Sequence, residues 1–138
     1  MGARRKLRRL RGEQGSAVLE MAISTMLYMT MVLGIMDLTR MIYAYNFVSF
    51  AAREASRYAS VRGTVNPVTS ANITTFVTND AVAAINKNKI TVTSTWSPNH
   101  SAGSTVTVNV SYTYTSLFSF VLGHSVTFQS SSKMVIAQ

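Results

Sequence analysis

The chain has 138 residues, a net charge of +8 and no cysteine. Disulfide bonds, thiolate catalysis and cysteine-held metal sites are therefore excluded. Residues 1–15 contribute +5 of the net charge, so the basicity belongs to one end of the chain and gives no support to nucleic-acid binding by the whole protein.

The basic N-terminal segment is followed directly by an apolar run. Its basic residues are Arg4, Arg5, Lys6, Arg8, Arg9 and Arg11. Residues 16–36, "SAVLEMAISTMLYMTMVLGIM", carry one charged side chain, Glu20. At about 1.5 Å per helical residue, this run is long enough to cross a hydrocarbon core of roughly 30 Å. Because flanking arginine and lysine stay in the cytoplasm, the sequence predicts a single membrane span with its N-terminus inside and its C-terminal part outside.

A cleaved secretory signal peptide is the alternative explanation of this N-terminus. Such signals have an apolar region of about 7 to 15 residues, followed by a small-x-small cleavage site. The run here is longer, and no such site with a polar break follows Met36. These features favour a membrane anchor over cleavage behind the run.

The helical pattern continues beyond the apolar run, through residues 37–63. Neither proline nor glycine interrupts it before Gly63, a plausible C-cap, so we expect one helix from about residue 16 to 62, roughly 70 Å long. One apolar face is expected at Leu38, Met41, Ile42, Tyr45, Val48, Ala52, Ala55 and Ala59. Its alanines, together with Ala51, leave room for another element to approach the backbone closely.

Charged residues in this second half have two explanations. Asp37 with Arg40, and Glu54 with Arg57, are three residues apart, a spacing that stabilises a solvated helix face by a few tenths of a kcal/mol. Together with Arg53, they are also candidates for contact with other subunits of an assembly.

Residues 64–138 are predicted to form a small α+β head. A turn-rich break at 64–72 precedes a short helix over 73–85. Alternation of apolar and polar residues then predicts strands at 90–96 and 106–114, joined as a hairpin by "SPNHSAGS", and a third strand from Ser125. A three-stranded antiparallel sheet with one apolar face needs a cover, which the two helices can supply.

The head offers little for catalysis. From residue 64 onward Asp80 is the only carboxylate, so paired-carboxylate chemistry cannot be assembled there. His100 and His124 lie in predicted turns without a second metal ligand nearby, and no catalytic triad or phosphate-binding loop is visible. The sequence predicts no enzyme, no metal and no cofactor.

Glu20 is the unusual residue of the apolar run, because a carboxylate in lipid costs about 2.5 to 3.5 kcal/mol. One explanation is that it reaches the cytoplasmic headgroups, since it lies about one turn from Ser16. Another is cleavage after Gly15, which would give Ser16 a new α-amino group. The amine and the carboxylate would then lower each other's free-energy cost in lipid, within one chain or between neighbouring chains.

The stretch "RRLRGEQG" followed by "SAVLE" resembles a class III prepilin signal, in which a basic leader ends in glycine and glutamate is the fifth mature residue. Residues 11–63 resemble more specifically the TadE-like pseudopilin family of tight adherence (Flp) pilus systems. The shared elements are Gly15 and Glu20, the apolar run, Asp37 with Arg40, Tyr45-Asn46 and "AAREASRYA" at 51–59.

This resemblance implies a pilin-like fold and a structural role in pilus assembly or secretion. A prepilin peptidase would cut between Gly15 and Ser16, and Glu20 would guide processing or assembly. The other implied partners are pilins, pseudopilins, assembly proteins of the bacterial inner membrane, and membrane lipid. Serine instead of phenylalanine at residue 16, and a head larger than that of major Flp pilins, indicate a minor component.

The expected organisation is a cleaved leader at 1–15, a transmembrane half-helix at 16–36, an extracytoplasmic half-helix at 37–63 and the head at 64–138. A competing hypothesis is an uncleaved single-pass signal-anchor protein whose extracytoplasmic head binds a ligand. The two hypotheses differ in the N-terminus of the mature chain and in the need for a pocket in the head.

Overall fold

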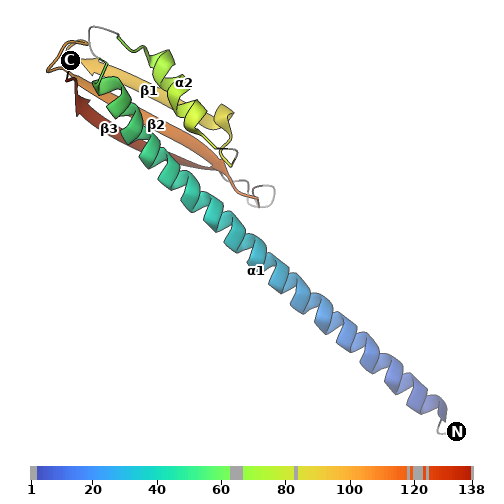
Figure 1. Ribbon diagram of the computed structural model, residues 1–138. Helices are drawn as coiled ribbons and strands as arrows, with labels where there is room; N and C mark the ends of the chain where they lie inside the picture. The colour runs from blue at the N-terminus through green and yellow to red at the C-terminus, as the bar shows by residue number, and fades with distance from the viewer. Residues whose placement is uncertain are drawn as a thin grey trace. The chain divides into compact units, whose positions relative to one another are not determined.

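The computed structural model describes residues 3–62, 67–82, 84–117, 119, 123 and 125–137, with side chains from Gly15 onward. The elements are α1 (Ala3–Ser60), α2 (Ser70–Asp80), η1 (Lys87–Lys89), β1 (Ile90–Ser97), β2 (Thr105–Thr115) and β3 (Ser125–Val135). They form two compact units, Met1–Leu38 and Thr39–Gln138. The predicted α+β fold, with a long first helix, a short second helix and a three-stranded antiparallel sheet, is confirmed (Figure 1).

The first helix begins earlier than the sequence suggested. We expected helix from about residue 16, whereas α1 begins at Ala3 and continues through Gly15. Arginine, lysine, leucine, glutamate and glutamine favour helix, and no proline lies in this part of the chain. The basic segment is therefore the first part of α1 in the uncut chain.

The sheet has the order β1-β2-β3, with both pairs antiparallel. Trp96 pairs with Val106, and Tyr112 pairs with Phe128, so the apolar side chains of the three strands share one face. Burial alternates along β2, as the sequence pattern predicted. The buried residues of β2 are Val106, Val108, Val110, Tyr112 and Tyr114. Figure 1 shows the C-terminal part of α1 and α2 over this face.

The buried face of α1 in the second unit differs in part from the predicted one. Leu38 belongs to the first unit, and Ile42 and Tyr45 are more than half exposed. Ala44 and Phe47, which were not expected in the core, are buried instead. The buried residues of α1 are Ala44, Phe47, Val48, Ala51, Ala52, Ala55, Ser56, Ala59 and Ser60. This end of α1 is apolar on more than one side, so helical spacing alone could not identify the side that meets the sheet.

Small residues bring α1 close to β3. Ala52, Ala55 and Ala59 are fully buried, in agreement with the small-sided face expected from sequence. The hydroxyl oxygens of Ser56 and Ser132 are 2.7 Å apart. Beyond the strand, the amide of Ala137 donates to the carbonyl of Ser60 at 3.0 Å. Two polar contacts thus fix the position of the helix on the sheet.

Removing the hydroxyl of Ser132 is expected to destabilise the head modestly. Ser56 donates its single hydroxyl proton to the Arg53 carbonyl, so Ser132 is the donor in the contact between the two serines. Ser132→Ala should therefore lower the free energy of unfolding by about 0.5 to 1.5 kcal/mol, measured by urea unfolding. Ser131→Ala is the matched control, because Ser131 is exposed on the opposite face of β3. Equal losses for the two variants would contradict this role of Ser132.

The second helix is shifted towards the N-terminus of its predicted range. α2 begins at Ser70 behind the N-cap Thr69, whose hydroxyl oxygen accepts from the amide of Asn72 at 3.3 Å. It ends at Asp80 rather than at residue 85. Ala81 and Ile85 are nevertheless buried, from the irregular segment that follows. The predicted apolar positions were therefore partly correct, while the helical state assigned to residues 81, 82, 84 and 85 was wrong.

The hairpin loop between β1 and β2 has the position predicted for "SPNHSAGS". Gly103 lies there at a φ of 86°, a conformation that favours glycine. Its amide donates to the Ile136 carbonyl at 3.0 Å, and the Ile136 amide donates to the Ser104 carbonyl at 2.8 Å. The loop is thus joined to the end of β3. Gly63, the predicted C-cap of the first helix, lies outside the described residues.

Candidate functional site

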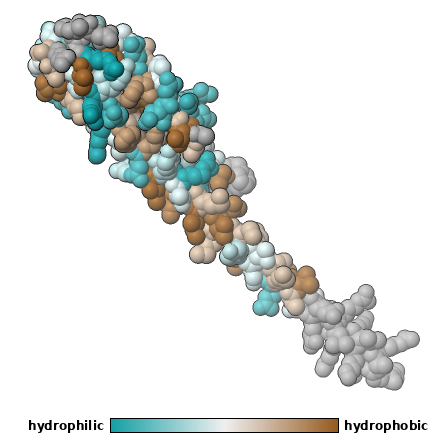
Figure 2. Space-filling view, in the orientation of Figure 1, coloured by the Kyte–Doolittle hydropathy of each residue, from teal (hydrophilic) through white to brown (hydrophobic). Residues whose placement is uncertain are grey.

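The first candidate site is the apolar part of α1 that starts at Gly15. Among the described residues, Gly15–Ser60 is the one helix apolar and long enough to cross a membrane, and none of its most apolar 18-residue stretch is buried. Figure 2 shows hydrophobic side chains on the surface here. In the first unit, the exposed large hydrophobic residues are Val18, Leu19, Met21, Ile23, Met26, Leu27, Tyr28, Met29, Met31, Leu33, Ile35, Met36 and Leu38.

These side chains project on all sides of the helix, which indicates an apolar environment. Backbone groups within the helix satisfy one another, as a membrane span requires. The hydroxyl of Thr30 donates to the Met26 carbonyl at 2.8 Å, so this polar side chain also has a partner within the helix. The unit is consistent with anchoring by a single membrane span.

Gly15, Ser16 and Glu20 lie together at the start of this segment. All three are exposed on α1, and apart from the adjoining helix backbone the position that a Cβ on Gly15 would occupy is open. Ser16 and Glu20 are four residues apart and therefore neighbours on one helix face. The side chains of the predicted topology signal, which ends at Arg11, lie outside the described residues.

The charged residues proposed for subunit contact lie along α1. Asp37 is partly exposed and Arg40 is exposed. Arg53 and Arg57 are exposed, Glu54 is partly exposed, and no ion pair joins Glu54 to Arg57 in the described part of the chain. The helix thus presents three arginines to solvent, and the subunit-contact prediction remains untested.

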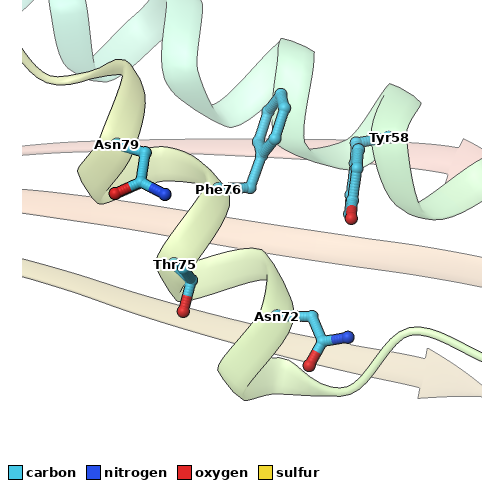
Figure 3. Close-up of a pocket in the computed structure, with 5 residues that line it drawn as sticks. All are labelled: Tyr58, Asn72, Thr75, Phe76 and Asn79. Atoms are coloured by element: carbon cyan, nitrogen blue, oxygen red, sulfur yellow. The ribbon is translucent and has the colours of Figure 1, made fainter.

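The head has an open hollow between α1 and α2, of about 340 Å³. It is lined by Tyr58, Asn72, Thr75, Phe76 and Asn79. Figure 3 shows Phe76 projecting from α2 towards Tyr58. Their rings stack with centroids 4.4 Å apart, and the Arg62 guanidinium lies 3.9 Å from the Tyr58 centroid. Because the two rings stack and Arg62 lies against Tyr58, this hollow is a packing contact that holds the two helices together.

A second hollow of similar volume lies beside the end of α2, and we call it the Asp80 hollow. Its lining residues are Tyr43, Asn46, Phe47, Phe50, Asp80 and Val82. Phe50 is 58% exposed and Val82 is 50% exposed, so the hollow is apolar and open. Asp80 is its one charged group. A cation on an apolar stem, such as an arginine side chain, suits these surroundings.

Of the two histidines considered as metal ligands, the structure describes His100. His100 is partly buried in the hairpin loop, where its ring centroid is 4.5 Å from that of Trp96. His100 therefore packs against Trp96. His124 lies outside the described residues. Within the described part of the chain, no three histidine or carboxylate groups come together in a way that could hold a metal ion.

Comparison with protein families gave a match to the model described as TadE-like protein, over residues 15–57. Over these residues the chain is similar to the TadE-like family. Comparisons with curated proteins and with solved structures gave no match. The TadE-like segment begins at Gly15 and ends at Arg57, so it includes the apolar span and most of the helix surface that covers the sheet. Family and fold together indicate a Tad pilus-associated, pilin-like structural protein.

Sequence reasoning did not identify the Asp80 hollow. Asp80 had been considered only as evidence against paired-carboxylate chemistry. The sequence did contain one indication of this site, since Asp80 is the only carboxylate after residue 64. The TadE-like match does not extend to Asp80, so the hollow combines a TadE-like helix with a part of the head that lies outside the match.

Proposed function

We propose that this chain is a minor pilin or pseudopilin of a tight adherence (Flp, type IVb-like) pilus assembly or secretion apparatus. A prepilin peptidase cleaves it between Gly15 and Ser16, and the new N-terminus starts the membrane-held part of α1. The observation that carries this proposal is the position of Gly15. It marks the start of the TadE-like match, lies directly before the exposed apolar span, and precedes Glu20 by five residues.

The chemistry of Glu20 supports this role. In lipid, the carboxylate needs a cationic partner, and the α-amino group of Ser16 would be one helical turn away after cleavage. The same carboxylate could instead meet the amine of a neighbouring subunit. In either arrangement, two charges that are costly in lipid compensate each other.

The proposed topology follows from charge and hydropathy. The arginines and the lysine of residues 4–11 keep the N-terminus in the cytoplasm, residues 16–36 cross the cytoplasmic membrane, and the head is extracytoplasmic. The partners in this account are the prepilin peptidase, other pilins or pseudopilins, the assembly proteins of that membrane and the lipid itself. The head's role is contact with other proteins outside the membrane.

Gly15→Val is expected to block processing, because a β-branched side chain would replace hydrogen next to the bond that is cut. In cells with an active prepilin peptidase, the variant should remain at the size of the full chain, while the wild-type chain becomes shorter by its basic leader. Gly34→Val is the matched control, since Gly34 lies in the same helix with open space at its Cβ position. Unhindered shortening of Gly15→Val would contradict cleavage at this site, and an uncut wild-type chain would favour the signal-anchor alternative.

A further inference from the structure

One face of α1 in the second unit is exposed and has a seven-residue repeat. Tyr43, Asn46, Phe50, Arg53 and Arg57 are all exposed, at spacings of three, four, three and four residues. They therefore lie on one stripe of the helix. Tyr43, Asn46 and Phe50 also line the Asp80 hollow, whereas the two arginines continue the stripe towards the end of α1. We call this set the outer stripe.

The surface formed by the outer stripe and the Asp80 hollow has a negative part at Asp80 and a positive part at Arg53 and Arg57. Asp80 is exposed and makes no ion pair or hydrogen bond among the described residues. Arg53 and Arg57 are exposed, and neither has an anionic partner in the described part of the chain. The second unit, residues 39–138, carries seven basic and only two acidic side chains, so copies of this unit repel one another unless a specific contact compensates. Asp80 is the carboxylate that could provide this contact.

When two parallel copies of α1 are displaced by seven residues along the helix axis, the outer stripe of one lies level with the outer stripe of the other. Tyr43 then lies level with Phe50, Asn46 with Arg53, and Phe50 with Arg57. The displacement is about 10.5 Å along the helix axis. At this displacement, Arg53 of one copy is level with Asn46 of the other, and thus with the hollow that contains Asp80. Phe50 and Tyr43 would supply apolar contact beside the charge pair.

Other arrangements of two copies are less favourable. Without displacement, Arg53 and Arg57 would face the same residues of the second copy, with repulsion between like charges. An antiparallel arrangement is excluded when both copies are anchored in one membrane with the same topology. This last step rests on the proposed function, which supplies the common anchor.

We propose that the Asp80 hollow of one copy receives Arg53 of a second, parallel copy displaced by seven residues along α1. Both copies use the outer stripe in this contact, one through its hollow and the other through Arg53. The contact therefore assigns this surface of the second unit to a second copy of this chain.

Photo-cross-linking of the full chain in membranes tests the contact. A benzophenone amino acid replaces Val82, which lines the hollow, in a copy with one tag, and a second copy carries another tag. We expect cross-links between the two tags that map to residues 50–57 of the second copy. The same probe at Ser131, which is exposed on the far face of β3, should give none. Cross-links from Val82 only to another protein, or to none, would overturn the inference.

Charge reversal tests the pair itself. Asp80→Arg and Arg53→Asp should each reduce the cross-link roughly five-fold, because attraction becomes repulsion across a partly exposed pair. The chain that carries both substitutions should regain it. Lys133→Asp, with the same change in charge as Arg53→Asp but on the far face of the sheet, is the control and should have no effect. Failure of the double variant to recover, with the folded head intact by limited proteolysis, would contradict an Asp80–Arg53 contact.

The same cells also show whether a negative result contradicts this inference or the proposed function. Membrane fractionation and the size of the chain report anchoring and processing in the same cells. Absence of the cross-link in a processed, anchored chain contradicts the inference alone. An unprocessed or unanchored chain contradicts the proposed function, and with it the parallel arrangement on which the inference rests.

Discussion

Replacing Glu20 with alanine is expected to leave the chain in the membrane but to lower the amount of assembled protein about tenfold or more. Removal of a carboxylate makes insertion easier, because the carboxylate costs about 2.5 to 3.5 kcal/mol in lipid. The amine of Ser16, in contrast, loses its partner in the assembled state. A loss of 1.4 kcal/mol is already tenfold in an association equilibrium. The measurement compares membrane-bound protein with protein in the sheared surface fraction.

Two controls make the Glu20 result specific. Glu20→Gln keeps the shape of the side chain and removes the charge, so it should resemble the alanine variant. Ser24→Ala, one turn further along the same exposed span, should behave like the wild type. Unchanged surface output from both Glu20 variants would contradict a role in assembly, and loss of the membrane-bound form would show a role in insertion instead.

Ala55→Leu is expected to lower the free energy of unfolding of the head by about 1 to 3 kcal/mol. Ala55 is 0% exposed, on the face of α1 that packs in the core with Val108 and Val110. Three additional carbon atoms cannot fit there unless α1 moves away from the sheet. The fluorescence of Trp96, the only tryptophan in the chain, reports unfolding in urea for the full chain in detergent.

The matched control for this substitution lies two residues further along the helix. Arg57→Leu introduces the same side chain at an exposed position, where the change should stay within about 0.5 kcal/mol. An Ala55→Leu variant as stable as the wild type would contradict close packing between α1 and the sheet.

The strands were predictable because their pattern is strictly alternating. In β2, valine and tyrosine alternate with threonine, asparagine and serine, and the structure buries the first set. The three strands therefore lie close to their predicted ranges. Helix boundaries were less accurate, since irregular segments can also bury apolar residues. Ala81 and Ile85 lie at helical spacing, yet they reach the core after α2 has ended.

The orientation of α1 was only partly predictable, for a similar reason. Alanine at 52, 55 and 59 marked the buried side correctly. Nearer the membrane span the helix is apolar in several directions, so Ile42 and Tyr45 satisfied the spacing as well as Ala44 and Phe47. The choice between them depends on where the sheet and the segment after α2 pack, which is a property of the tertiary structure.

The two candidate sites also differ in how far the sequence alone could predict them. Gly15, Ser16 and Glu20 form a local pattern, so sequence was enough to single them out. The Asp80 hollow joins residues 43–50 to residues 80–82, which are about thirty positions apart, and only the folded head brings them together.

The N-terminus of the mature chain tests the central claim most directly. The protein is isolated from membranes of cells with an active prepilin peptidase, and its N-terminal peptide is determined by mass spectrometry. The account predicts a chain that begins with Ser16, followed by "AVLE". A chain that still begins at residue 1 or 2 would contradict it.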